Sequence, residues 1–171
     1  MAKLIKNRHL ATDTWSLLSA GATLADLPEG GDAIVPLALW LAQRDALAGR
    51  AGRVGVWLDG HEDPAPLAAD LGSLPLVAVN FPKFSDGRGF STAALLRERY
   101  GFKGELRAIG DVLRDQLFFL RRCGFDAFAL RDDQDAAAAE AAFDDFTEAY
   151  QAGVDEPMPL FRRRLARPEV R

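Results

Sequence analysis

The chain has 171 residues, of which 49% are hydrophobic and 27% charged, a composition typical of one globular domain. No apolar run approaches the roughly 18–20 residues needed to span a bilayer, and the N-terminus lacks an apolar signal segment. The single cysteine excludes an internal disulfide and fits a reducing compartment. We therefore expect a cytoplasmic protein without a membrane span.

The net charge of −4 is distributed unevenly. Residues 160–171 hold five arginines and one acid, Glu169, whereas residues 1–159 hold 16 basic and 24 acidic side chains. General nucleic-acid binding needs a basic face, which this acidic body does not offer. We expect a single α/β domain over residues 1–159 and an extended or mobile Arg-rich tail over residues 160–171. The tail is either a solvated end or a docking arm for an acidic partner.

The predicted elements alternate regularly along most of the chain. A strand or hairpin is predicted within residues 4–18, followed by a helix over residues 37–48 that begins after Pro36 and stops at Gly49. Strands that alternate with helices and lack polar alternation favour a mainly parallel sheet covered by helices. The further strands are predicted over residues 54–58, 76–80, 105–109 and 127–130, and the further helices over residues 66–71, 91–100, 112–123 and 135–151.

Two helix–strand units resemble each other. Gly101-Phe102 and Gly124-Phe125 each fit a left-handed glycine after a helix with an apolar residue behind it, and the glycines lie 23 residues apart. Repeated units of this size are typical of a β/α barrel and of an open doubly wound sheet. The sequence leaves both open: an incomplete or distorted β/α barrel, or an open doubly wound sheet.

Ligands of parallel α/β folds bind at the carboxyl ends of the strands. Here a glycine loop follows the predicted strand 76–80, and Ser91 is predicted to open the next helix as its N-cap. Free backbone N–H groups at such a point, flanked by cations, favour an anion. We therefore predict an anion-binding rim, with the candidate residues Lys83, Asp86, Gly87, Arg88, Gly89, Ser91, Arg107, Asp111 and Arg131.

Structural interpretations compete with this rim. Residues 86–89 could simply be a tight turn with Arg88 paired to a nearby aspartate, and Asp111 could be a helix N-cap. Arg107 lies inside an apolar strand, so if it is buried it needs a carboxylate or an anion.

No metal site is predicted, because His9 and His61 lack companions at ligand spacing. The sequence has neither the third glycine of a dinucleotide loop nor a phosphate-binding Gly-Lys-Ser/Thr loop, so the cofactor stays unknown. Cys123 follows a helix whose dipole would raise its pKa, which favours a core residue over a nucleophile. Catalytic residues also stay unknown.

Two helices have unusual apolar surfaces. Residues 117–120 make one helix apolar almost all round, which predicts core packing or a subunit interface in a homo-oligomer. The acidic helix over residues 135–151 is predicted to bury Phe143, Phe146 and Tyr150 against the body.

Several motifs lie between residues 75 and 131: Asp86-Gly-Arg-Gly-Phe-Ser91, Ala94-Leu-Leu-Arg97, Gly104-Glu-Leu-Arg-Ala-Ile-Gly-Asp111, Asp115-Gln116 and Cys123-Gly-Phe-Asp-Ala-Phe128. Together they resemble a bacterial family of unknown function that carries the label of a probable oxidoreductase involved in sulfite reduction. The resemblance implies a role beside assimilatory sulfite reductase, which supplies sulfide for cysteine biosynthesis.

Two functional hypotheses follow. The first is an accessory protein of assimilatory sulfite reduction that acts with sulfite reductase or its electron donor. The second is a small β/α enzyme or binding protein for an anionic metabolite at the rim. Whether the chain catalyses a reaction is open.

Overall fold

The computed structural model describes residues 3–166 and contains one eight-stranded sheet in the order β2-β1-β8-β7-β6-β5-β4-β3. Neighbouring strands from β3 to β8 are parallel, whereas β1 is antiparallel to both β8 and β2. The predicted α/β fold with a mainly parallel sheet is confirmed. The strands are β1 (Lys3–Lys6), β2 (His9–Ala11), β3 (Trp15–Leu17), β4 (Asp32–Pro36), β5 (Val54–Asp59), β6 (Leu76–Phe81), β7 (Glu105–Gly110) and β8 (Ala127–Leu130).

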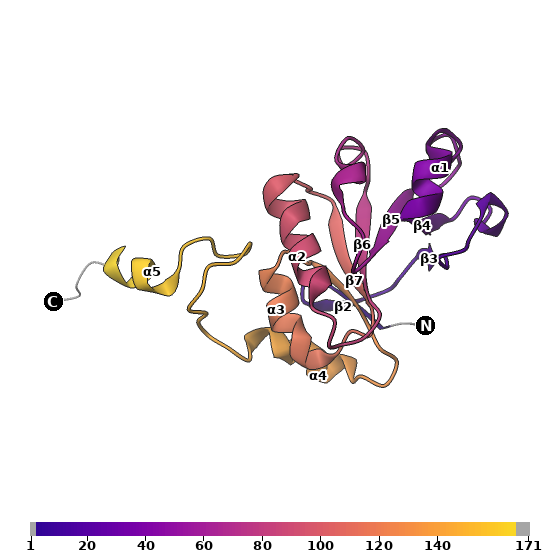
Figure 1. Cartoon of the computed structure of the whole chain (residues 1–171). Helices are drawn as coiled ribbons and strands as arrows, with labels where there is room; N and C mark the ends of the chain where they lie inside the picture. The colour runs from indigo at the N-terminus through magenta and orange to yellow at the C-terminus, as the bar shows by residue number, and fades with distance from the viewer. Residues whose placement is uncertain (1–2, 167–171) are drawn as a thin grey trace.

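The sheet is curled into a half-barrel (Figure 1). Its two edge strands, β2 and β3, are joined by only three residues, Thr12, Asp13 and Thr14. Consecutive Cα atoms are about 3.8 Å apart, so these edges approach within about 15 Å where the segment crosses. The sheet must therefore bend round on itself, and the distorted-barrel alternative describes it better than an open sheet.

Helices α1 to α4 pack on the convex face of the sheet, whereas α5 does not touch it (Figure 1). Strand side chains such as Val56, Val79 and Leu106 point outward into the main core and meet helix residues such as Leu47 and Leu120. The helices are α1 (Leu37–Ala48), α2 (Arg88–Ala94), α3 (Leu117–Arg122), α4 (Ala136–Ala141) and α5 (Leu160–Ala166).

The concave face carries a second, smaller core. Ile34, Trp57, Leu76, Ala78 and Ile109 form it, with Trp15 and Ala129 packed at its border. The crossing segment runs over this face, and Trp57 donates its indole N–H to the Leu18 carbonyl beyond it, at 2.9 Å. The concave face is thus walled by strands and by the N-terminal segment.

Two predicted helix starts are wrong. Helix α2 begins at Arg88, after Gly87, so Ser91 lies inside the helix. The Asp86 carboxylate, placed before the helix, accepts from the Arg88 N–H and provides the acceptor expected of Ser91. Asp111 does not cap a helix either, because its carboxylate accepts from the Phe84 N–H; α3 begins six residues later, at Leu117.

The C-terminal prediction is also partly wrong. The helix expected over residues 135–151 ends early, in a 3-10 turn over Ala142–Asp144, which buries Phe143 but leaves Phe146 and Tyr150 exposed. Residues 160–166, expected to be extended, form α5, which projects from the body (Figure 1). Arg163 holds this helix to the preceding chain by donating to the Ala149 carbonyl. The last five residues of the predicted tail, 167–171, lie outside the described residues.

Both predicted glycine helix ends are confirmed, because Gly101 and Gly124 have positive φ angles of 66° and 103°. No helix within residues 3–166 combines the length and apolarity that crossing a membrane requires.

Candidate functional site

The loops at the carboxyl ends of β5, β6, β7 and β8 are neighbours, because these strands are adjacent in the sheet. They carry seven of the nine predicted residues, all except Ser91 and Arg107. Four of these seven form two ion-paired groups, Gly87 and Gly89 flank Arg88 in the first of them, and Lys83 lies apart.

Arg88 and Asp86 form the first group. The Arg88 Nη2 lies 2.6 Å from Asp86 Oδ2, and its Nε lies 2.9 Å from Oδ1. Hydrogen bonds from Arg88 lower the pKa of Asp86 to about 2 from the ordinary 3.8. His61 lies nearby, with its Nδ1 3.6 Å from the Asp59 carboxylate. Arg88 is therefore already engaged by a carboxylate, as the tight-turn alternative describes.

The two glycines of this loop differ in what they allow. A Cβ on Gly89 would press into the Phe81 ring, at 2.7 Å from Cζ, so this glycine lets α2 pack closely on β6. A Cβ on Gly87 would meet no atom within 4 Å. The space that Gly89 leaves is therefore filled by the Phe81 ring and is not open to a ligand.

Arg131 and Asp111 form the second group. The Arg131 guanidinium lies 2.7 Å from Asp111 and 2.7 Å from Asp133. Asp111 also accepts from the Phe84 N–H at 2.9 Å, and this bond, with the one from Arg131, lowers the pKa of Asp111. Gln116 donates to the Phe84 carbonyl at 2.9 Å, so the loop is held from both sides.

The remaining candidates lie apart from these groups. Lys83 is exposed, and within residues 3–166 its ammonium makes no ion pair or hydrogen bond, which leaves it available to a ligand. Ser91 is exposed on α2, one turn beyond the helix start. Ser91 therefore does not lie beside the free backbone N–H groups at the start of the helix.

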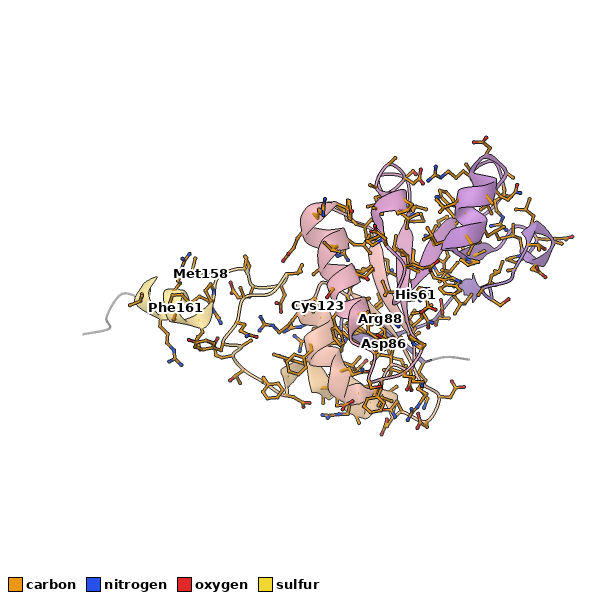
Figure 2. The ribbon with its side chains drawn as sticks, in the orientation of Figure 1. His61, Asp86, Arg88, Cys123, Met158 and Phe161 are labelled. Atoms are coloured by element: carbon orange, nitrogen blue, oxygen red, sulfur yellow. The ribbon has the colours of Figure 1, made fainter. Side chains whose placement is uncertain are left out.

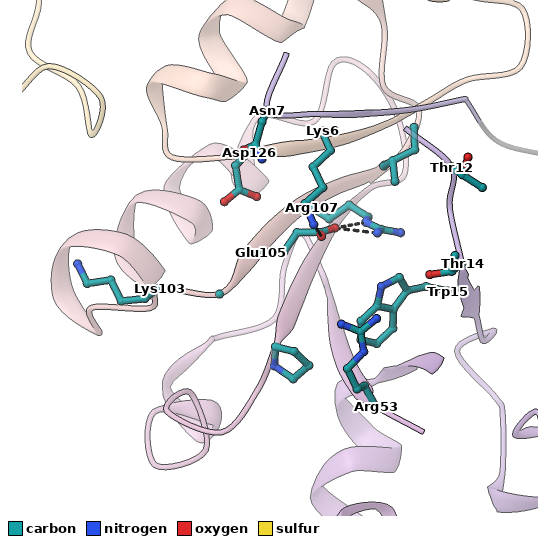
Figure 3. A pocket seen from close by; sticks show the side chains of 13 residues that line it. Lys6, Asn7, Thr12, Thr14, Trp15, Arg53, Lys103, Glu105, Arg107 and Asp126 are labelled. Carbon is teal, nitrogen blue, oxygen red and sulfur yellow. Dashed lines mark hydrogen bonds and ion pairs between the residues drawn. The ribbon is translucent and has the colours of Figure 1, made fainter. Parts of the chain in front are cut away.

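Arg107 is separated from the rim. It points to the concave side of β7, about 10 Å along the strand from Gly110 at the usual rise per residue. Its side chain is 3% exposed and pairs with Glu105 at 2.7 Å and with Asp13 at 3.0 Å. Figure 3 shows Arg107 beside Glu105 and Lys6, above the indole of Trp15 in this view. Asp13 and Glu105 thus supply the carboxylate partners that a buried arginine needs, and Arg107 does not require an anion.

Within residues 3–166 no cluster of three or more His, Cys, Asp or Glu side chains is arranged to hold a metal ion. Cys123 is half-buried, and burial raises the pKa of its thiol, with Asp155 and Glu98 adding to the effect. The rim therefore offers charge pairs, one unengaged lysine and backbone groups, but no activated thiol.

A different surface was missed by the sequence reasoning. Phe119 and Phe146 are 53% and 55% exposed; the Phe119 ring meets the Phe118 ring edge-on, and the Phe146 ring packs on it at a tilt. Together with Phe90 and Tyr150 they line a groove of about 460 Å³ between α3 and residues 146–153. The apolar run 117–120 pointed to part of this surface, but the groove depends on where the later segment returns.

The groove continues into the C-terminal arm, which we define as residues 147–166. Figure 2 shows Met158 and Phe161 on this arm, well away from the sheet. Tyr150 connects the two parts, because it lines the groove while its carbonyl accepts from the Leu160 N–H at 3.0 Å.

Comparison with known proteins gives one match. A family described as bacterial protein of unknown function (DUF934) matches residues 55–161, from β5 to the start of α5. The matched stretch contains the rim, Arg107 and the aromatic groove, whereas Asp13 lies before it. No curated protein and no solved structure matches the chain.

Proposed function

The chain belongs to this bacterial family of unknown function, and we propose that it is an accessory protein of assimilatory sulfite reduction. In this proposal it binds sulfite reductase or its electron donor in the cytoplasm and thereby serves cysteine biosynthesis. The pathway rests on the motif resemblance described above. The mode of action rests on one structural observation, the apolar surface of the groove and arm.

We call this surface the docking surface; its exposed members are Phe119, Phe146, Tyr150, Phe161 and Leu165, with exposed fractions of 53%, 55%, 69%, 49% and 82%. Phe119 and Phe146 are neighbours, with ring centroids 6.2 Å apart, and Tyr150 lines the same groove, whereas Phe161 and Leu165 lie further out on the arm. Scattered single apolar residues are normal on a protein surface, but neighbouring large ones usually mark an interaction site. Aromatic side chains are also enriched at binding hot spots. The surface therefore favours a protein partner.

The arm is held in shape before any partner binds. The Arg163 guanidinium lies 2.8 Å from Glu148 and donates to the Ala149 carbonyl at 3.0 Å. Val154 N–H donates to the Arg122 carbonyl at 2.8 Å, which fixes the arm's base to α3. Such pre-organisation reduces the entropy lost on binding.

Charge on α5 indicates the kind of partner surface. Arg162 and Arg164 are exposed beside Phe161 and Leu165, and within residues 3–166 neither makes an ion pair. A complementary surface offers an apolar pocket with carboxylates around it, since opposite charges steer association and fix register. An acidic face of the reductase or of its electron donor would meet this description.

The proposal is tested by affinity purification from cells that use sulfate as sole sulfur source. We expect sulfite reductase or its electron donor in near-equal amount with the native chain, and at least tenfold less with Phe161→Ala/Leu165→Ala. The matched control is Leu41→Ala, because Leu41 is 40% exposed on α1, outside the docking surface. Equal recovery with the double variant would show that the arm takes no part in binding. Recovery of neither protein with the native chain would exclude the proposal.

The second candidate function is a small enzyme or binding protein for an anionic metabolite at the rim. It is favoured by one observation, the unengaged Lys83 in the loop that leads to the exposed Arg88 at the start of α2. In this proposal a ligand anion would replace Asp86 as the partner of Arg88. Arg88→Ala should abolish binding of sulfate or phosphate, measured by calorimetry, and change stability by only about 0.5 kcal/mol. Unfolding of this variant would show that Arg88 is structural.

A further inference from the structure

The concave face of the half-barrel carries an open hollow of about 830 Å³. Its outer end meets the rim at Gly110, Arg131 and Asp132, and it shares no residue with the docking surface. Its walls are Trp15, Leu17, Ile34, Ile109 and Ala129, and Arg107 lies at its inner end. Ligand sites of proteins usually have this size and this mixture of apolar walls with a few polar groups.

The hollow exists because the inward positions beside it are small. Ala11 and Ala129 each lie opposite Leu4 in the register, so all three side chains face the same side of the sheet. Inner positions of closed β/α barrels are mostly filled by bulky branched residues. Here the two alanines leave that space open, and the crossing segment bounds it without filling it.

The inner end of the hollow is polar but electrically balanced. The buried Arg107 guanidinium is 3.0 Å from Asp13 and 2.7 Å from Glu105, and Glu105 also pairs with Lys6 at 2.8 Å. Two cations thus face two carboxylates at this end, and at the outer end the Arg131 guanidinium is already paired with Asp111 and Asp133. A charged ligand would give up its hydration without meeting an uncompensated opposite charge, which costs several kcal/mol for a buried ion.

We propose that this hollow is a binding site for a small uncharged molecule with an apolar ring and a planar hydrogen-bonding end of the carboxamide type. Such an end matches the Asp13–Arg107 pair, because its N–H can donate to the carboxylate and its oxygen can accept from the guanidinium. The ring lies against Ile34, Ile109 and the indole of Trp15. The site is independent of the proposed accessory role, since it shares no residue with the docking surface, and it touches the rim only at its outer end.

The test uses three probes that share one ring: benzamide, acetophenone and benzoate. Benzamide donates and accepts, acetophenone only accepts, and benzoate carries a negative charge. Titration of the isotope-labelled full chain, followed by NMR, should show saturable benzamide binding with shifts centred on Trp15, Ile109 and Ala129. Both other probes should bind at least tenfold more weakly. Absence of saturable shifts up to about 20 mM benzamide, far above typical fragment affinities, would overturn the proposal.

Filling the hollow provides the matched control. Ala129→Leu should weaken benzamide binding at least tenfold, whereas Ala46→Leu, on the exposed side of α1, should leave it unchanged. Ala11→Leu, on the edge strand, fills the same space from the other side if Ala129→Leu does not fold. Unchanged binding in a folded filled variant, or tighter binding of benzoate than of benzamide, would contradict the site.

Discussion

Asp13 and Arg107 are 94 residues apart in the chain, yet their side chains form an ion pair at 3.0 Å on the concave face of the sheet. Asp13 lies in the three-residue segment that joins the two edges of the half-barrel, and Arg107 lies in a central strand. The pair therefore ties the crossing segment to the middle of the sheet and closes the inner end of the hollow.

Removal of this contact should destabilise the protein. Asp13→Ala leaves the buried guanidinium with Glu105 alone, so we expect a loss of about 2 kcal/mol in the free energy of unfolding. Urea denaturation followed by circular dichroism measures it. Asp45→Ala is the control, because Asp45 is exposed on α1 and its carboxylate makes no hydrogen bond or ion pair within residues 3–166. A loss below about 0.5 kcal/mol would show that the pair does not hold the segment.

Gly110 should tolerate no side chain. Its φ is +92°, and a Cβ there would collide with the Phe81 carbonyl oxygen and the Asn80 side chain. We expect Gly110→Ala to cost more than about 2 kcal/mol, since left-handed geometry alone costs about 1–2 kcal/mol. Gly87→Ala is matched to it, because φ is −83° and the space is open. Similar thermal midpoints for the two variants would contradict the geometry of this loop.

The Asp86–Arg88 pair should give a measurable acid dependence. Since Arg88 lowers the pKa of Asp86 to about 2 from 3.8, the pair's contribution is fully present above pH 3.8 and is lost as the pH falls through about 2. In Arg88→Ala we expect the Asp86 pKa to return toward 3.8, as read from the carboxyl carbon by NMR. The pKa of Asp111, which hydrogen bonds from Phe84 and Arg131 lower, should stay low in the same variant. An unchanged Asp86 pKa would show that the pair does not form in solution.

Cys123 should be a slow nucleophile. Burial raises the pKa of its thiol above the ordinary 9.0, so little thiolate is present near neutral pH. At about pH 8 we expect iodoacetamide to alkylate the native protein at least tenfold more slowly than the protein unfolded in urea. Mass spectrometry over time measures both rates. Equal rates would mean that the thiol is open to solvent.

The sequence predicts the repeated part of the fold well, because the apolar runs that end at Asp59, Asn80 and Leu130 are long enough to define strands. It does not predict how the first 17 residues cross the sheet. That path depends on the contact of Asp13 with Arg107, and no local pattern encodes it.

The candidate site was harder to predict for a related reason. Arg88 and Arg131 look like anion ligands in the sequence, but whether their charges are free depends on the rotamers that bring Asp86, Asp111 and Asp133 against them. The docking surface depends on the early end of the helix before Asp145, which exposes Phe146. Helix length set by such tertiary contacts does not follow from propensity.

Direct binding between purified proteins tests the central claim. The native chain and Phe161→Ala/Leu165→Ala are each titrated into purified sulfite reductase and, separately, into its electron donor, with complex formation followed by sedimentation velocity. We predict a saturable complex of the native chain with one of the two, and binding at least tenfold weaker for the folded double variant. No complex with either protein up to about 100 μM, where even weak interfaces associate, would contradict the accessory role.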